Sequence, residues 1–183
     1  SKFYLFNPEM KKWKSIVYLD ADVIVRHSLN SLKKKTSFSA RMEYGENPLK
    51  TQFIENTFQN DQVIKLTKLG RLFDLKKKAF NSGVMVIPSK VINSNSLDIL
   101  KELHKEFGHL SKYGEQGILN LYFQNRWKLL PTIYNTLPSH VSEVYHLRAS
   151  SIKAIILHFG DAGYENKAWN PTNYFYSEWK KNL

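Results

Sequence analysis

The sequence predicts an α/β protein with a mainly parallel sheet, because short apolar strands alternate with amphipathic helices along the chain. Its 183 residues are 42% hydrophobic and 14% aromatic, which is the length of one domain and the composition of a folded protein. Polar residues follow the apolar strands, and in such sheets ligands gather at the carboxyl ends of strands. We therefore expect one domain over residues 1–183, with a site at that edge.

The expected strands are short and apolar, as buried strands are. The first is the run Ile16–Leu19, which continues through two aspartates to Val25, and the last ends at His158. A β-branched segment closed by Pro88 also reads as a strand, because proline cannot continue the ladder. The expected strands cover residues 16–25, 38–44, 83–87 and 154–157.

Three helices are expected from apolar residues at helical spacing. The first covers Thr51–Leu66. The second begins at the capping residue Ser96 and ends at Gly108, with leucines on one face. The third begins near Glu115 and continues through Phe123. Together with the strands they predict layers of helix and sheet.

The net charge of +11 comes mainly from lysine, since 22 of the 27 cationic residues are Lys. We interpret the lysine clusters as a solvated surface, with attraction of a polyanion or a diphosphate as the alternative. Only five arginines are present, which argues against base recognition and a specific nucleic-acid partner.

Cysteine is absent, so disulfides and cysteine-based zinc sites are excluded. We expect a cytoplasmic location, with the Golgi lumen as the alternative. No apolar run approaches the roughly 20 residues that a membrane helix needs. The sequence therefore predicts no transmembrane segment.

Asp20 and Asp22 form the one acidic pair at i and i+2 in the chain. In an extended segment this spacing places both carboxylates on one side. Carboxylate oxygens suit Mg²⁺ or Mn²⁺, which also bind substrate phosphates. The alternative is a polar strand end with two solvated acids.

His158 ends an apolar strand and precedes a loop that contains Gly160, Gly163 and Lys167. Glycines let backbone N–H groups approach an anion, and lysine adds a charge, so this loop suits phosphate. A lone histidine after an apolar strand is more often structural than a ligand.

Two short segments carry amides that are suited to bind sugar hydroxyls. Asn81-Ser82-Gly83 precedes an expected strand, and Glu115-Gln116 opens an expected helix. The alternatives are an ordinary turn and a helix start with an acid near the positive end of the dipole.

These segments in this order resemble glycosyltransferase family 8, which includes glycogenin and bacterial lipopolysaccharide hexosyltransferases. The resemblance rests on SIVYLDADVIVRHSLNSL, FNSGVMVIPSK, EQGILNLYF, LPTIYN and HFGDAGYENKAWNP, and it spans Ser1 to about Trp179.

The resemblance implies a nucleotide-sugar-binding layered α/β fold of the GT-A type, with a mainly parallel mixed sheet and helices on both faces. It also implies metal-dependent, retaining transfer of a hexose from UDP-glucose or UDP-galactose to a glycan, lipid-linked or protein acceptor. Its metal ligands would be Asp20, Asp22 and His158, holding Mn²⁺ or Mg²⁺.

The resemblance further assigns residues to the donor and to the reaction. Gln116 and Glu115 would lie at the reacting carbon, and Glu43 would be a further sugar contact. The nucleotide-sugar contacts would be Lys2, Asp20, Ala21, Asp22, Asn81, Ser82, Gly83, Gly163 and Lys167.

Three features depart from the family pattern. Lys167-Ala168-Trp169 lies farther from the histidine than the family's K-P-W and lacks the proline, and Glu115 replaces an aspartate. The opening β-α units that hold the nucleotide base are missing before Ser1. We therefore expect a partial domain with one uncovered flank of its sheet, which alone binds Mn²⁺–UDP poorly and associates through that flank.

Three other interpretations remain open. A phosphatase of the haloacid dehalogenase type also places D-x-D after a strand, but Ile24 stands where that class has threonine or valine. A catalytically impaired or regulatory module with this fold fits the departures above. A basic nucleic-acid-binding protein rests on net charge alone.

Overall fold

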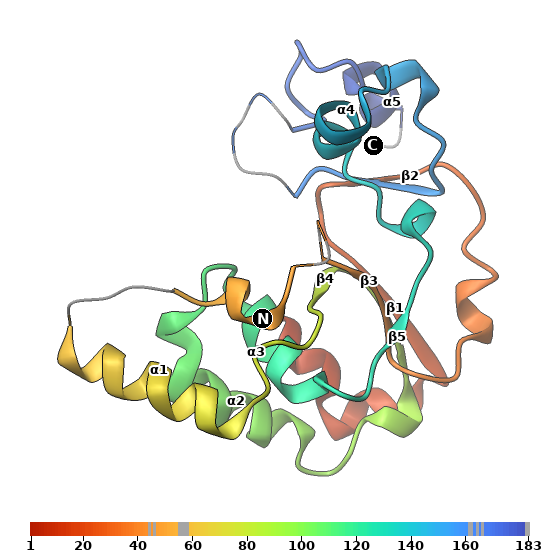
Figure 1. Cartoon of the computed structure of the whole chain (residues 1–183). Coiled ribbons are helices and arrows are strands. Elements are labelled where there is room, and N and C mark those ends of the chain that lie inside the picture. The colour runs from red at the N-terminus through yellow and green to blue at the C-terminus, as the bar shows by residue number, and fades with distance from the viewer. Residues whose placement is uncertain are drawn as a thin grey trace.

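The computed structural model describes residues 1–43, 45, 47–54, 59–160, 163, 165 and 167–181. Two sheets form its framework (Figure 1). The larger has the strand order β1-β4-β3-β5, and the smaller pairs β2 with β6. The strands are β1 (Ser15–Leu19), β2 (Val23–Val25), β3 (Ser39–Met42), β4 (Phe80–Pro88), β5 (Lys128–Leu129) and β6 (Ile156–His158).

The strand pairing corrects the expectation of a mainly parallel sheet. β4 runs antiparallel to both β1 and β3, and β2 runs antiparallel to β6. Among the described strands only β3 and β5 pair in parallel. The prediction was wrong because it assumed that strands separated by helices run in the same direction. Here β4 pairs with β1 and with β3 and runs opposite to both.

The α-helices between residues 60 and 123 form one layer against the larger sheet, whereas the two later ones lie beside the smaller sheet (Figure 1). The α-helices are α1 (Asn60–Leu72), α2 (Ser96–Phe107), α3 (Glu115–Phe123), α4 (Pro138–Tyr145) and α5 (Tyr176–Lys180). The 3-10 helices are η1 (Lys2–Phe6), η2 (Pro8–Lys12), η3 (Leu32–Lys34), η5 (Leu49–Gln52), η6 (Ser89–Val91), η7 (Gly108–Leu110), η8 (Thr132–Tyr134) and η9 (Ala149–Ser151). Helices α2 and α3 pack together, and α3 packs on β4. In the described part of the chain, no helix is long and apolar enough to cross a membrane.

Both faces of the central strand β4 are buried, because alternate side chains point to opposite faces. Met85 and Ile87 join the aromatic core under the helices, in which Phe38 and Phe123 stack at 3.8 Å. Val84 and Val86 join a second cluster with Ile156 of β6, which binds the two sheets together. The second face of the sheet is covered by the 3-10 helices η3 and η8 and by the smaller sheet. Helices therefore lie on both faces as predicted, but those on this second face are short 3-10 helices.

Several predicted elements differ from the observed ones. The helix expected over residues 51–66 begins only at Asn60, since Leu49–Gln52 is a 3-10 helix and Phe53 forms a bridge with Ser111. Part of that prediction, residues 55–58, lies outside the described residues. The helices predicted at Ser96 and Glu115 are confirmed.

Candidate active site

Asp20 and Asp22 lie where the chain passes from the larger sheet to the smaller one. The expected continuous strand is broken into β1 and β2, with Ala21 and Asp22 in a turn between them. The backbone N–H of Asp20 donates to the Gly83 carbonyl at 2.8 Å, which holds Asp20 against β4. The two carboxylates therefore come together through a turn and not through the extended spacing that we expected.

His158 reaches the aspartates through the pairing of β2 with β6. Val23 lies opposite His158 in that antiparallel ladder, and the Phe159 N–H donates to the Asp22 carbonyl at 2.8 Å. Ligands far apart in sequence are thus adjacent because their strands pair. The predicted convergence of Asp20, Asp22 and His158 is confirmed, with ligand atoms within 4.8 Å of one another.

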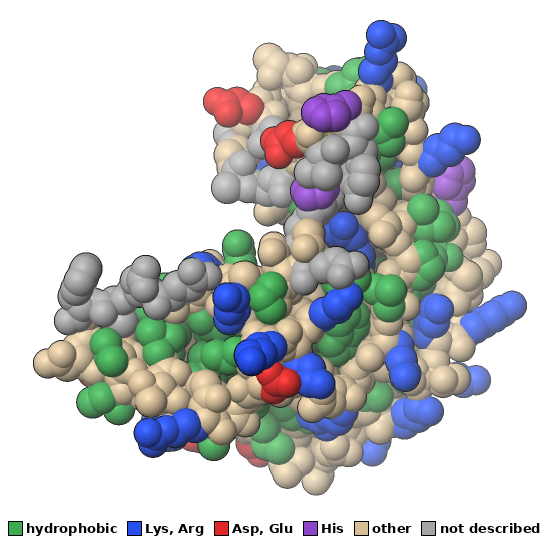
Figure 2. All heavy atoms as spheres, viewed as in Figure 1, with side chains coloured by type: hydrophobic (Ala, Val, Ile, Leu, Met, Phe, Trp, Pro, Cys, Tyr) green, Lys and Arg blue, Asp and Glu red, His purple; other side chains and the backbone are tan. Residues whose placement is uncertain are grey.

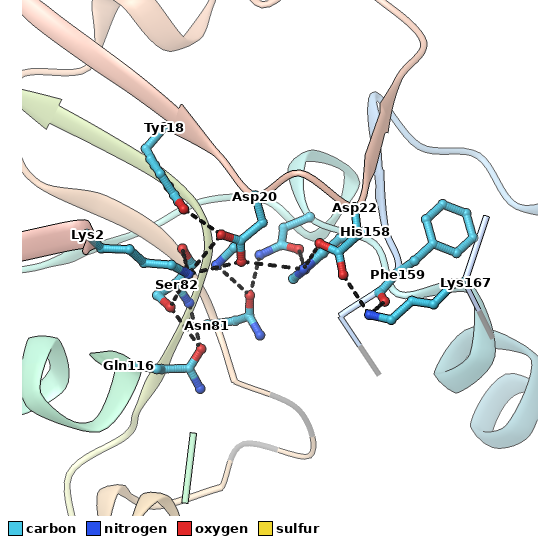
Figure 3. Close-up of polar contacts among 12 residues, drawn as sticks. Lys2, Tyr18, Asp20, Asp22, Asn81, Ser82, Gln116, His158, Phe159 and Lys167 are labelled. Carbon is cyan, nitrogen blue, oxygen red and sulfur yellow. Dashed lines mark hydrogen bonds and ion pairs between the residues drawn. The ribbon is translucent and has the colours of Figure 1, made fainter. Parts of the chain in front are cut away.

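The donor atoms of this cluster fit a hard divalent cation. His158 Nε2 lies 3.4 Å from Asp22 Oδ1 and 3.8 Å from Asp20 Oδ2 (Figure 3). Nε2 is buried and has no hydrogen-bond partner among the described residues, which is costly for a polar atom. Two carboxylates and one imidazole are ligands suited to a divalent metal ion.

Two glycines hold the imidazole ring of His158 in place. A Cβ atom at Gly83 would lie 2.1 Å from the ring, and one at Gly160 would lie 2.6 Å from it. Real Cβ atoms do not approach that closely, so neither position can carry a side chain while the ring stays where it is. Glycine at these positions lets two backbone segments enclose the ligand.

Lys2 and Tyr18 orient Asp20. The Lys2 ammonium lies 2.9 Å from the carboxylate and 3.1 Å from Ser82 Oγ, and the Tyr18 hydroxyl donates to Asp20 at 2.6 Å (Figure 3). Burial, followed by this hydrogen bond to a carboxylate, raises the pKa of Tyr18 far above its ordinary value. Tyr18 is therefore a permanent donor to Asp20.

Lys167 binds Asp22 from the other side. Its ammonium lies 2.7 Å from Asp22 Oδ2 and also donates to the Phe159 carbonyl. Burial raises the pKa of the Asp22 carboxyl, whereas the adjoining imidazole of His158 and the ammonium of Lys167 lower it. The two neighbours prevail, and the pKa lies well below the ordinary range. Asp22 is thus ionised and ready to bind a cation.

Gln116 is the centre of a second hydrogen-bond network. Its Oε1 accepts from the Ser82 backbone N–H at 2.8 Å, and its Nε2 donates to Glu43 at 2.5 Å and to Gln52 at 2.8 Å. A backbone N–H can only donate, so this contact fixes which end of the amide carries the oxygen. Asn120 anchors the same strand by bonding the N–H and the carbonyl of Phe80.

These networks border one cleft with a volume of about 680 Å³. Figure 2 shows the surface hollowed between the part that carries α4 and α5 and the body of the molecule. Of the residues predicted from sequence, those that line the cleft are Lys2, Asp20, Asp22, Glu43, Asn81, Ser82, Gly83, Gln116 and His158.

Four predicted residues stand apart from that lining. Glu115 borders a smaller neighbouring hollow together with Lys2. Its Oε2 accepts a hydrogen bond from the backbone N–H of Lys2 at 2.8 Å. Ala21 is exposed in the turn between the aspartates, and Gly163 is exposed with a φ of +102°. Lys167 reaches the site only through Asp22.

Sequence reasoning missed the residues of the far wall and of the second layer. Helix α4, which carries Ser139, His140 and Glu143 along the cleft, was not expected. Asn135, which contacts His158, stands in the LPTIYN segment, where its amide was the available signal. Gln52 falls in the helix predicted from residue 51, but its place in the cleft wall was not predicted. In the structure it ends the 3-10 helix η5 and lines the cleft.

A sequence model described as "Glycosyl transferase family 8" matches residues 1–173. The lipopolysaccharide 1,2-glucosyltransferase of Escherichia coli is 28% identical over 186 residues, which cover 92% of this chain and 49% of that protein. Glycosyltransferase GlyF of Streptococcus pneumoniae is 25% identical over 93% of this chain and 37% of its own. The chain thus spans less than half the length of these relatives.

Solved structures share the GT-A-like α/β fold. An active-site mutant of LgtC superposes with a TM-score of 0.69 at 17% identity, over 99% of this chain and 64% of that one. The glycosyltransferase GlyE of Streptococcus pneumoniae gives 0.64 at 19% identity, over 100% of this chain and 42% of that one. At these identities the likeness concerns the fold alone.

Proposed function

The chain belongs to glycosyl transferase family 8, and from this premise we propose that it moves a hexose from UDP-glucose or UDP-galactose to an acceptor hydroxyl. The proposed reaction depends on Mn²⁺ or Mg²⁺ and retains the configuration at the anomeric carbon. The observation that carries the proposal is the cluster of Asp20, Asp22 and His158 at one end of a polar cleft.

The binding of the donor diphosphate is assigned to the metal end of the cleft. A bound cation would supply positive charge against the charge that develops on the departing diphosphate. Lys2 and Lys167 add fixed charge on either side of the two aspartates. In the metal-free protein these two ammonium groups neutralise the carboxylates, and phosphate oxygens compete for them when the donor binds.

The sugar is assigned to the wall formed by Asn81, Ser82 and Gln116. In a front-face reaction the bond between the anomeric carbon and the diphosphate oxygen breaks, and the acceptor oxygen bonds to the same face. The acceptor proton passes to the departing oxygen. The Oε1 of Gln116 already accepts from Ser82, which makes it a poor nucleophile and favours this route over a covalent intermediate.

The acceptor would enter between the loop that carries Glu43 and helix α4, because both border the open part of the cleft. A glycan, a lipid-linked sugar and a protein hydroxyl all meet this requirement. A catalytically impaired module of the same fold is the alternative function, and the cytoplasmic location stays a prediction.

Incubation of the protein with each UDP-hexose, with and without Mn²⁺, tests the proposal. We expect that UDP is released only when Mn²⁺ is present. NMR of the product should show that the transferred sugar keeps the anomeric configuration that it had in the donor. Asp20→Asn should abolish this release, whereas Asp98→Asn on the exposed face of α2 should not change it. Binding of Mn²⁺–UDP without any turnover would favour the impaired module.

A further inference from the structure

Three buried side chains, the amides of Asn81 and Asn135 and the imidazole of His158, form a hydrogen-bonded chain behind the metal-binding cluster. The Gly83 N–H donates to Asn81 Oδ1 at 2.9 Å, and Asn135 Nδ2 donates to the same oxygen at 2.9 Å. Asn135 Oδ1 then lies 2.9 Å from His158 Nδ1. Asn135 is fully buried, and His158 is 3% exposed, so water does not compete for these bonds.

The backbone of β4 sets the direction of every hydrogen bond in this chain. A backbone N–H only donates, so the Asn81 atom that faces Gly83 is the carbonyl oxygen. The Asn135 atom that faces this oxygen must then be the amide nitrogen. As a result, the oxygen of Asn135 faces His158, and a rotated amide would place two acceptors together.

We propose that Asn135 is a positioning residue, which fixes the tautomer of His158 so that Nε2 presents a lone pair to the metal. Because Asn135 Oδ1 can only accept, His158 Nδ1 must carry the proton. In the neutral ring Nε2 is then unprotonated, and it points at Asp20 and Asp22 without a hydrogen bond. This inference rests on the proposed metal site and adds the residue that prepares it.

Without Asn135, the carboxylate of Asp22 would favour the other tautomer of His158. Asp22 Oδ1 lies 3.4 Å from Nε2, and a carboxylate there attracts a proton to that nitrogen. A neutral ring without a partner at Nδ1 would therefore carry its proton on Nε2, and Nε2 could then not bind a metal. Asn135 reverses this preference by accepting at the other nitrogen.

Asn135 is held beside β6, the strand that carries His158, which keeps the contact in register. Its neighbour Thr136 bridges Leu157 in parallel, and the His158 N–H donates to the Thr136 carbonyl at 2.8 Å. Gly83 and Gly160 enclose the ring on both sides. The backbone around the ring is therefore close-packed on the side of these glycines.

Nitrogen-15 NMR of the metal-free protein tests the inference directly. At a pH at which the ring is neutral, the wild-type His158 should carry its proton on Nδ1. In Asn135→Leu, which removes the acceptor at similar volume, the proton should move to Nε2. Asn135→Asp keeps an oxygen toward Nδ1 and should restore the wild-type tautomer. Its second oxygen faces Asn81 Oδ1, so this variant should be less stable than the wild type.

Titration with Mn²⁺ alone, followed by electron paramagnetic resonance, gives the second measurement. Asn135→Leu should weaken Mn²⁺ binding by about 10- to 100-fold, as loss of a partner behind a metal ligand does, and Asn135→Asp should recover most of it. Thr136→Val is the matched control, since it removes one part-buried side-chain hydrogen bond, to the Thr132 carbonyl, on the same segment and keeps the backbone contact with His158. It should leave the Mn²⁺ affinity unchanged, whatever it does to stability.

A wild-type neutral ring protonated at Nε2 would overturn the inference, and so would an Asn135→Leu protein with unchanged tautomer and Mn²⁺ affinity. The wild-type spectrum decides even where the leucine variant does not fold. A wild-type protein that binds no Mn²⁺ would defeat the proposed metal-dependent function, while the spectra would still decide the role of Asn135.

Discussion

The side-chain amide of Gln116 is oriented by hydrogen bonds to three neighbouring residues. All the polar atoms of its amide are engaged, with the oxygen on Ser82 and the nitrogen on Glu43 and Gln52. A neutral amide can make these contacts, because one end accepts and the other donates. The side chain of Gln116 is therefore held in one orientation at the wall of the cleft.

Replacement of Gln116 by alanine should lower turnover far more than donor affinity, because its proposed contact is at the reacting carbon. Steady-state kinetics and calorimetry with Mn²⁺–UDP check this split. An equal loss of both would mark Gln116 as a binding contact only.

Gln116→Glu should be destabilising, since the new oxygen would face the acceptors of Glu43 and Gln52. We expect a loss of about 1–3 kcal/mol in the free energy of unfolding at neutral pH, measured by urea denaturation. Gln62→Glu, in the first turn of α1, is the control and should change stability far less. Equal effects in both variants would contradict the proposed network.

The ion pair of Asp22 with Lys167 should make metal-free stability depend on acid pH. The folded pKa of Asp22 is depressed, so its contribution is full above the ordinary carboxyl value of about 4 and is lost as pH falls toward the folded value. The stability difference between wild type and Asp22→Asn, about 1–2 kcal/mol at neutral pH, should therefore shrink below about pH 4.

Thermal unfolding with a chelator present, followed from neutral to acid pH, checks this. Asp74→Asn removes an exposed partner of Lys77 at 4.0 Å and should show little effect at any pH. A difference between wild type and Asp22→Asn that grows on acidification would contradict the assignment of Asp22.

At the scale of elements, an irregular pairing of β4 with β3 shapes the wall of the cleft to which we assign the sugar. Ala40 of β3 pairs with Met85, but the next residue, Arg41, pairs with Asn81, so three residues of β4 have no partner on β3. Bulges of this kind turn side chains out of the regular alternation. They place Ser82 toward Lys2 and Gln116, and bring Gly83 against His158.

Gly83→Ala should therefore damage the metal site through sterics alone, because the new Cβ atom would lie 2.1 Å from the ring of His158. We expect a loss of at least about tenfold in Mn²⁺ affinity, comparable to loss of a partner behind a metal ligand. Gly70→Ala is the control. Its nearest neighbour would be Leu75 at 3.9 Å, and within helix α1 alanine should add about 0.5–1 kcal/mol of stability. Unchanged Mn²⁺ binding by Gly83→Ala would show that the ring can relocate.

At the scale of the molecule, the candidate site joins the two sheets. Asp20 follows β1 of the larger sheet, whereas Asp22 precedes β2 and His158 ends β6 of the smaller one. A shared ion would add a link between them beyond the apolar cluster of Val84, Val86 and Ile156. Figure 2 shows cationic side chains spread over the visible face, which agrees with a solvated surface.

Mn²⁺ should therefore stabilise the whole fold, since unfolding separates its ligands. At a concentration of about 100 times the dissociation constant, binding adds about 2.7 kcal/mol, which calorimetry would record as a higher unfolding temperature. Asp20→Asn should remove this rise. An equal rise in that variant would place the bound ion elsewhere.

The sequence by itself determined the strands around Tyr18, Val86 and Leu157 and the helices at Ser96 and Glu115, because apolar periodicity and helix starts are local. The family resemblance brought together Asp20, Asp22 and His158, whose side chains do lie close to one another. Sheet direction, the break between Asp20 and Asp22, and helix α4 were decided by tertiary structure. Those features depend on which segments pair across the chain, which no local pattern records. The partner of His158 was decided in the same way, since only the pairing around β6 brings Asn135 to it.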